Sequence, residues 1–288
     1  MRMREGTLLV FLLLFAACSP QQEQGTPATG SSTLDLTTWS IAAADPATGD
    51  VGVAVASCVP ELHADGVAAL VPGHGVAAVQ ASWDLTNRNR VFDALREGLS
   101  AQEVIDRVAD PAADSVLGRR QYGVATIHGG SVQVAGFTGE DILARNSDPE
   151  NDSWAGIMAD PSMGVTSQGN TLVGPPVVSD PLAAFQRHDP AGRNTLPDRL
   201  MRALEAGAIA GGDVRCNDEQ VVQTAATAAI LVARGGDDPY ATADIGMTDQ
   251  GTPNAPWLAI SVVDTLQGAN PLVELRQRYD DWRHLNRD

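Results

Sequence analysis

Three pairs of short apolar runs, each pair divided by a cluster of turn-forming residues, constrain this chain more than any other feature. Val, Ile, Thr and aromatic residues favour strands, and Gly, Pro, Asn and Asp between two such runs favour tight turns. Each pair therefore predicts a β-hairpin. The three predicted hairpins join residues 38–44 to 51–57, residues 66–71 to 75–82, and residues 121–127 to 131–137.

Helical spacing appears between and after these hairpins. Val91, Leu95 and Leu99 recur at helical intervals, and Ser100 with Glu103 forms a capping box ahead of a second helix. The polar stretch 138–160 shows no period and predicts a long surface loop. Further strands are expected at 163–168, 221–233 and 257–263, and helices at 89–99, 100–108, 177–185, 197–209 and 271–285.

The order of these elements predicts the fold class. Strands come in hairpins with helices grouped between them, which differs from the strict strand–helix alternation of parallel sheets. We therefore expect an α+β domain of mostly antiparallel sheets covered by helices.

The first eighteen residues predict a signal peptide. Arg2 and Arg4 precede an apolar run at 8–17 that ends at Cys18. A membrane-spanning helix needs roughly 20 apolar residues, so this run is too short to remain as a span.

The end of this segment, Phe15-Ala16-Ala17-Cys18, resembles a lipobox, in which the cysteine becomes the lipidated first residue of the mature protein. The alternative is ordinary cleavage after two small residues, with Cys18 an incidental thiol. Ser19 follows the cysteine, which by resemblance to enterobacterial lipoproteins favours the outer membrane. We expect an exported protein whose membrane contact is the lipid anchor alone.

Residues 19–37 are rich in Ser, Thr, Gln, Gly and Pro and predict a flexible tether. The folded domain is then expected to occupy residues 38–288, which is enough chain for one large domain with a substantial core.

The charge balance bears on partners. The chain has 19 Lys and Arg against 36 Asp and Glu, a formal net charge of −17, and no cluster of basic residues that could follow a phosphate backbone. We therefore expect no nucleic-acid partner.

Two cysteines remain besides Cys18, namely Cys58 and Cys216. In an exported chain an even pair favours a disulfide. Two buried free thiols or one reactive cysteine are the alternatives that the spacing leaves open.

Four separated segments resemble, in the same order, the Ntn-hydrolase-like (N-terminal-nucleophile) family catalogued as domain of unknown function 1028. They are Thr38-Trp39-Ser40-Ile41, the run 49–57 (Gly-Asp-Val-Gly-Val-Ala-Val-Ala-Ser), Ser167-Gln168-Gly169-Asn170, and Gly212-Asp213-Val214-Arg215. The resemblance implies an αββα four-layer sandwich over residues 38 to about 282. It implies no settled substrate.

Thr38 matches the position where Ntn hydrolases carry their nucleophile, and Ser40 of the same segment is a second candidate catalytic residue. In such enzymes the side chain attacks an amide carbonyl while the residue's own α-amine, with a pKa of about 8, acts as base. The alternative is that Thr38 is a β-branched residue that simply begins a strand.

The segment 167–170 offers amide and hydroxyl groups for an oxyanion hole: Gln168 and Asn170 as catalytic groups, Ser167 and Gly169 as substrate-binding groups. The alternative is a strand end with local hydrogen bonds. Asp213 and Arg215 could orient a nucleophile or bind a substrate carboxylate, with a structural ion pair as the alternative.

The five histidines are scattered without metal-ligand spacing, so we expect no metal and no cofactor. Two functions remain. One is an amide or peptide hydrolase of the cell envelope with Thr38 as nucleophile, and the other is a non-catalytic module that binds a small amide or peptide ligand.

The two functions differ at the bond between Thr37 and Thr38. An N-terminal nucleophile requires this bond to be cut, and the cut would separate the domain from its lipid anchor. Since the sequence holds no other maturation signal, it favours the uncut, anchored form.

Overall fold

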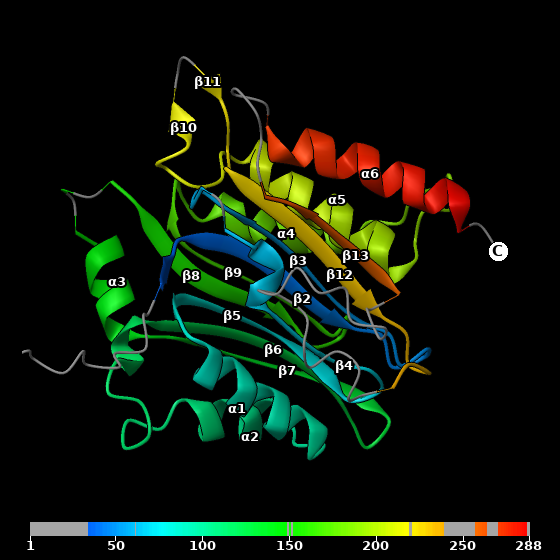
Figure 1. Cartoon of the computed structure of the whole chain (residues 1–288), viewed down its shortest axis with the longest axis horizontal. Coiled ribbons are helices and arrows are strands. Elements are labelled where there is room, and N and C mark those ends of the chain that lie inside the picture. The colour runs from blue at the N-terminus through cyan, green and yellow to red at the C-terminus, as the bar shows by residue number, and fades with distance from the viewer. Residues whose placement is uncertain are drawn as a thin grey trace, which may run out of the picture. The chain divides into compact units, whose positions relative to one another are not determined.

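The computed structural model describes residues 34–60, 62–148, 150, 152–218, 221–238, 257–263 and 270–286. Within these ranges the protein consists of two antiparallel sheets, a short two-stranded ribbon and six α-helices (Figure 1). The expected α+β class with antiparallel sheets is confirmed. The expected signal peptide and lipidation site lie outside the described residues.

The first sheet has five strands, with β5 and β6 at its centre. β6 and then β7 extend it on one side of β5, while β1 and β4 both pair with the other edge of β5, at opposite ends of that strand. The strands are β1 (Leu34–Leu36), β4 (Ala68–Val71), β5 (Gly75–Trp83), β6 (Arg120–His128) and β7 (Ser131–Thr138).

The second sheet has six strands in the order β13-β12-β3-β2-β9-β8, so the first predicted hairpin, β2 and β3, lies in its middle. The strands are β2 (Thr38–Ala44), β3 (Val51–Ser57), β8 (Trp154–Asp160), β9 (Val165–Leu172), β12 (Thr227–Ala233) and β13 (Leu258–Val262). The ribbon joins β10 (Asn217–Asp218) to β11 (Val221–Val222).

The two sheets face each other, with β2 contacting β5 and β6, and helices cover their outer faces (Figure 1). The first sheet carries α1 (Leu85–Arg96) and α2 (Ala101–Val108), and the second carries α4 (Pro176–Gln186), α5 (Leu196–Ile209) and α6 (Pro271–Leu285). The remaining helix is α3 (Glu140–Asn146), and two 3-10 turns occupy Ala64–Val67 and Leu117–Arg119.

Two apolar cores follow from strand alternation. On β2, Ala42 and Ala44 point between the sheets, whereas Trp39, Ile41 and Ala43 point at the helices of the second sheet. Both faces of β2 and β3 are therefore buried, which explains why these strands read as continuous apolar runs.

The predicted capping box is present. Ser100 accepts from the backbone N–H of Glu103, whose carboxylate accepts from the Ser100 N–H in turn. The helix predicted to begin at residue 89 begins at Leu85 instead, because the carboxylate of Asp84 caps it by accepting from the Asn87 N–H at 2.8 Å. The helix predicted at 271–285 has those bounds.

Three expectations are corrected. Residues 138–160 were expected as one loop, but they contain α3 and β8; α3 is too short to show a period, since only Ile142 and Asn146 of it are buried. The strand expected at 221–233 is broken at 223–226. The tether was expected to reach Thr37, but β1 pairs with β5 and Thr37 is buried, so the fold begins before Thr38.

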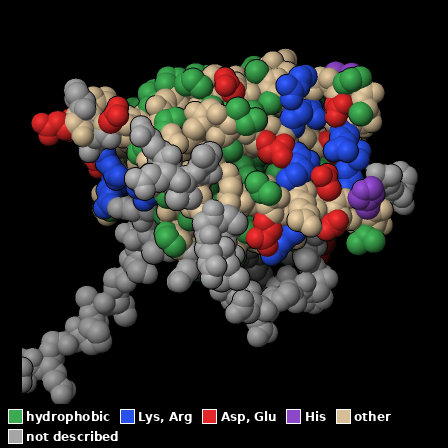
Figure 2. Space-filling model, turned by 90° about the horizontal axis from the view of Figure 1, so that it is seen from above, with side chains coloured by type: hydrophobic (Ala, Val, Ile, Leu, Met, Phe, Trp, Pro, Cys, Tyr) green, Lys and Arg blue, Asp and Glu red, His purple; other side chains and the backbone are tan. Residues whose placement is uncertain are grey.

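The surface seen from above mixes charges of both signs (Figure 2). Around α6, Arg276 pairs with Glu205 and with Asp280, and Arg278 pairs with Glu274. In the part of the chain that the structure describes, no helix is long and apolar enough to cross a membrane.

Candidate active site

The chain crosses from one sheet to the other at Thr37. Leu36 pairs with Ala81 of β5 in the first sheet, and Thr38 pairs with Ser57 of β3 in the second. The bond between Thr37 and Thr38 therefore lies at the edge of the space between the sheets. The Thr37 carbonyl accepts a hydrogen bond of 2.6 Å from Ser57 Oγ.

Thr38 begins the central strand of the second sheet with its side chain on the same face as Ser40, toward the first sheet. Its side chain is 0% exposed, and its Oγ1 has no hydrogen-bond partner among the described residues. A buried hydroxyl without a partner costs about 1–3 kcal/mol, so the Thr38 hydroxyl does not stabilise the sheet through hydrogen bonding to the described residues.

A hydrogen-bonded chain of side chains links the sheets beside Thr38. Ser40 Oγ donates to Gln80 Oε1 at 2.6 Å and accepts from Gln168 Nε2 at 2.7 Å. Gln80 Nε2 donates to Gln121 Oε1 at 2.8 Å and to the Thr38 carbonyl at 3.3 Å. Ser40 is therefore fully buried with hydrogen-bond partners on both sides.

Gln121 extends this network to β9. Its Nε2 donates to the Gly169 carbonyl at 3.0 Å, and its Oε1 accepts from Asn170 Nδ2 at 3.2 Å. The neighbouring Gly123 makes room for Gln168, since a Cβ at Gly123 would lie 1.9 Å from Gln168 Oε1. A glycine in mid-strand here is therefore required by the close approach of the opposite sheet.

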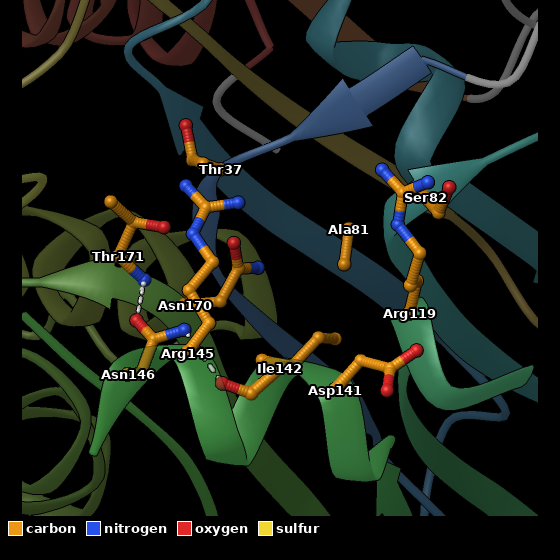
Figure 3. A pocket seen from close by; sticks show the side chains of 10 residues that line it. All are labelled: Thr37, Ala81, Ser82, Arg119, Asp141, Ile142, Arg145, Asn146, Asn170 and Thr171. Atoms are coloured by element: carbon orange, nitrogen blue, oxygen red, sulfur yellow. Dashed lines mark hydrogen bonds between the residues drawn. The ribbon is translucent and has the colours of Figure 1, made fainter. Parts of the chain in front are cut away.

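A pocket of about 240 Å³ opens next to Thr37 (Figure 3). Its walls come from the crossing residue, the end of β5, the turn before β6, the helix α3 and the end of β9. The lining residues are Thr37, Ala81, Ser82, Arg119, Asp141, Ile142, Arg145, Asn146, Asn170 and Thr171. Asn170 thus belongs both to the pocket and to the network around Gln121.

Backbone strain concentrates at this pocket. Three non-glycine residues of the described part have positive φ, and two of them, Ala81 (φ 68°) and Thr171 (φ 58°), line the pocket. A β-branched residue such as Thr rarely adopts this conformation. Thr171 is held there by its N–H, which donates to Asn146 Oδ1 at 2.7 Å. Strain of this kind is typical of ligand-binding and catalytic sites.

A buried ion-pair cluster supports the β5 wall of the pocket. Arg120 contacts Asp84 and Asp114 and donates to the Ser82 carbonyl. Burial opposes the charge of Asp114, but hydrogen bonds from Arg120 and Asn87 outweigh it and hold the pKa of this carboxyl below its ordinary value. The Ser82 carbonyl is therefore held from behind by groups that have partners, while the Ser82 hydroxyl is buried without one.

The segment 167–170 is divided between the two faces of β9. Gln168 pairs with Ser40 and lies between the sheets, whereas Ser167 pairs with Ile41 and lies on the helix side. Gly169 takes part through its carbonyl, which accepts from Gln121.

Asp213 and Arg215 form an ion pair with each other, at 2.9 Å between Arg215 Nη2 and Asp213 Oδ2, in a turn that does not line the pocket. The same turn contacts the end of β9, where the Val214 N–H donates to the Thr171 carbonyl at 3.1 Å.

Cys58 and Cys216 form a disulfide with a Cα–Cα distance of 5.8 Å, as expected. Cys58 directly follows Ser57, the residue that donates to the Thr37 carbonyl. The disulfide therefore ties the end of β3 beside the sheet crossing to the turn that holds Asp213.

Sequence reasoning missed several residues of this site: Ser57, Gln80, Ser82, Arg119, Gln121, Arg145 and Asn146. One signal was available for Gln80, which is a lone amide inside the apolar run 76–81. Arg145 and Asn146 were missed because the sequence predicted a surface loop at 138–160, where the structure has α3. Among the described residues no group of three His, Cys, Asp or Glu side chains could hold a metal ion.

Comparison with known proteins supports the resemblance to domain of unknown function 1028. The crystal structure of protein SPO2555 from Silicibacter pomeroyi, assigned to the same family of unknown function, shares the fold with a TM-score of 0.59 at 24% identity, covering 86% of this chain and 89% of that one. No curated protein matches the chain. The family of unknown function DUF1028 matches residues 38–256, most of the chain. The protein therefore belongs to the DUF1028 family.

Proposed function

We propose that this protein is a latent amide or peptide hydrolase of the N-terminal-nucleophile type, with Thr38 as its nucleophile. The observation that carries the proposal is the position of the Thr38 hydroxyl: it is unpartnered and fully buried at the start of the central strand, and it follows a carbonyl that accepts from Ser57. Because Thr38 begins a central strand, as the nucleophile of Ntn hydrolases does, we also propose that the helix–sheet–sheet–helix arrangement is the four-layer Ntn sandwich.

The first reaction would be a cut of the protein's own chain. In the uncut protein Thr38 is shielded from any other substrate, so the Thr37 carbonyl is the one it can attack. Thr38 Oγ1 bonds to the Thr37 carbonyl carbon, the C–N bond to Thr38 breaks, and the hydroxyl proton passes to the freed amine. Water then hydrolyses the ester, leaving a Thr37 carboxylate and a Thr38 with a free α-amine.

Ser57 would assist this step. Its Oγ donates to the carbonyl oxygen that becomes negatively charged when the carbonyl carbon is attacked. A donor placed in advance at such an oxygen contributes about 10²–10³-fold to rate in known acyl-transfer sites.

The cut would also free the active site. The new amine is a suitable base for attack on an external amide, because its pKa lies near neutrality. Residues up to Thr37, including β1 along the edge of β5, would no longer be bonded to the domain. Gln80 would continue to hold the Thr38 carbonyl.

We place the precursor in the cell envelope, as an exported lipoprotein anchored through Cys18 after removal of residues 1–17. On this account, cleavage before Thr38 activates the domain and releases it from its anchor. An anchored molecule is then a precursor, and an active one is soluble.

The alternative function is a binding module that is never cut. It is favoured by the order of the upstream chain, since β1 pairs with β5 and Thr37 is 4% exposed. In that form Thr38 has no free amine, and the pocket beside Thr37 is the ligand site.

N-terminal sequencing of the purified full-length chain over time tests the proposal. We expect a new N-terminus at Thr38 in wild type and in Thr38→Ser, none in Thr38→Ala, and formation about 10²–10³-fold slower in Ser57→Ala. Equal appearance of this N-terminus in wild type and Thr38→Ala would mean that another protease makes the cut, which contradicts the self-cleavage step.

A further inference from the structure

The pocket beside Thr37 has a charged mouth and a buried polar floor. Arg119, Asp141 and Arg145 are exposed at its mouth, whereas Ser82 and Asn170 at its floor are 1% and 4% exposed. Figure 3 shows Arg145 reaching from α3 toward Thr37 and Asn170, and Arg119 lying beside Ser82.

The floor carries polar groups that the fold leaves without partners. Thr37 and Ser82 both line the pocket, and their hydroxyls are buried and have no hydrogen-bond partner in the described part of the chain. Buried polar groups are nearly always paired, and the exceptions mark places where a ligand or water supplies the bond. The strained backbone at Ala81 and Thr171 frames the same floor.

The mouth carries two arginines and one carboxylate in a strongly negative protein. Arg119 and Arg145 each make an interaction of their own, and the whole chain has a formal net charge of −17. Guanidinium groups bind carboxylates through paired, charge-assisted hydrogen bonds, and each has five donors, so a bond already made by an arginine does not exhaust it.

We infer that this pocket binds a small molecule with a carboxylate, which lies between Arg119 and Arg145, and with a polar amide portion that reaches the floor. A volume of about 240 Å³ is below the roughly 300–1,000 Å³ of sites for drug-sized ligands and suits a compound the size of an acylated amino acid. The chemical class is therefore a small carboxylated amide.

This inference rests on the proposed function only in calling the ligand a substrate. The pocket wall formed by Thr37 is the residue that the cut would remove. A carboxylated amide held at the mouth would then extend past the vacated wall toward Thr38. The carboxylate would set which amides enter, and Thr38 would act on the amide carbonyl.

Binding is tested in the full-length Thr38→Ala chain, which cannot form the ester intermediate, so the result does not depend on whether the wild type cuts itself. The probes are N-acetyl-L-alanine, its neutral carboxamide and inorganic phosphate, titrated by ligand-observed NMR. We expect the carboxylate to bind about 10-fold or more tightly than the carboxamide, and Arg119→Gln or Arg145→Gln to remove about the same factor.

Arg193→Gln is the matched control, because Arg193 is an exposed arginine that pairs with Asp280 outside the pocket. It should bind the carboxylate as the Thr38→Ala chain does. Equal binding of the acid and the carboxamide, no binding of either, or unchanged binding in both pocket variants would overturn the inference. Phosphate binding as tightly as the carboxylate would overturn the assignment to carboxylates.

Discussion

The two ends of the space between the sheets differ in chemistry although the same strands build both. Along β2 the inward residues change from Ala44 and Ala42 to Ser40 and Thr38, and along β3 they change from Val55 to Ser57. The apolar end removes surface from water, which stabilises the fold by about 25 cal/mol per Å².

The polar end contributes little stabilisation through burial of apolar surface. Its groups either bond one another, as Ser40, Gln80 and Gln168 do, or have no partner, as with the Thr38 hydroxyl. The difference indicates that one end holds the sheets together and the other end holds the candidate site.

The largest effect is expected at Thr38. Thr38→Ala should abolish both the cut and any amide hydrolysis, while the free energy of unfolding changes by less than about 1 kcal/mol relative to the uncut chain, because removal of an unpartnered hydroxyl offsets the loss of one buried methyl group. Intact mass and urea melts measure the two quantities. If Thr38→Ala lowered the free energy of unfolding as much as a substitution in the apolar core does, Thr38 would belong with the apolar end that holds the sheets together.

The disulfide should have the next largest effect. Replacing Cys58 and Cys216 by Ser removes a cross-link spanning 158 residues, and the chain-entropy model predicts a loss of about 5 kcal/mol. Wild type melted with reductant is the control and should lose a similar amount. Since Cys58 adjoins Ser57, we also expect slower self-cleavage.

A pair of substitutions separates the two ends directly. Leu231→Ala at the apolar end should cost about 2–5 kcal/mol of unfolding free energy and leave the rate of self-cleavage within a factor of two or so. Gln80→Leu at the polar end should cost about 1–3 kcal/mol, because Ser40 and Gln121 lose a partner, and should slow the cut strongly.

Equal effects of these two substitutions on self-cleavage would contradict the comparison between the apolar and polar ends. If Leu231→Ala slowed the cut as much as Gln80→Leu did at equal loss of stability, the two ends would not be separable.

The smallest expected effect is on how the stability of the protein depends on pH. The pKa of Asp114 is lowered in the folded protein, so its contribution to stability is present above the unfolded value of 3.8 and is lost as pH falls through the folded value. Melts below pH 3.8 should therefore show a steeper loss of stability in wild type than in Asp114→Asn. Parallel curves would contradict the role given to the Arg120 cluster.

The sequence predicted the hairpins and most helices because their signals are local. Turn residues such as Gly129 and Gly130 and the Ser100 capping box act within a few positions. The sheet crossing at Thr37 was not predicted, since Leu34–Leu36 read as part of a polar tether and their pairing with β5 depends on residues about 45 positions away.

The candidate site was predicted only in part, because some of its residues meet through contacts between positions far apart in the sequence. Gln168 and Asn170 were found through a family motif, whereas Gln80 and Gln121 join them by bonds between sheets that no local pattern contains. Asp213 followed from the same kind of motif, but it pairs with Arg215 and is not among the residues that line the pocket.

Intact mass spectrometry of the membrane and soluble fractions tests the central claim most directly. The account predicts a soluble species that begins at Thr38, together with a membrane-bound precursor that begins at lipidated Cys18. A cell that contains the Cys18 species alone, with catalytic or binding function intact, would contradict the claim that Thr38 is an N-terminal nucleophile.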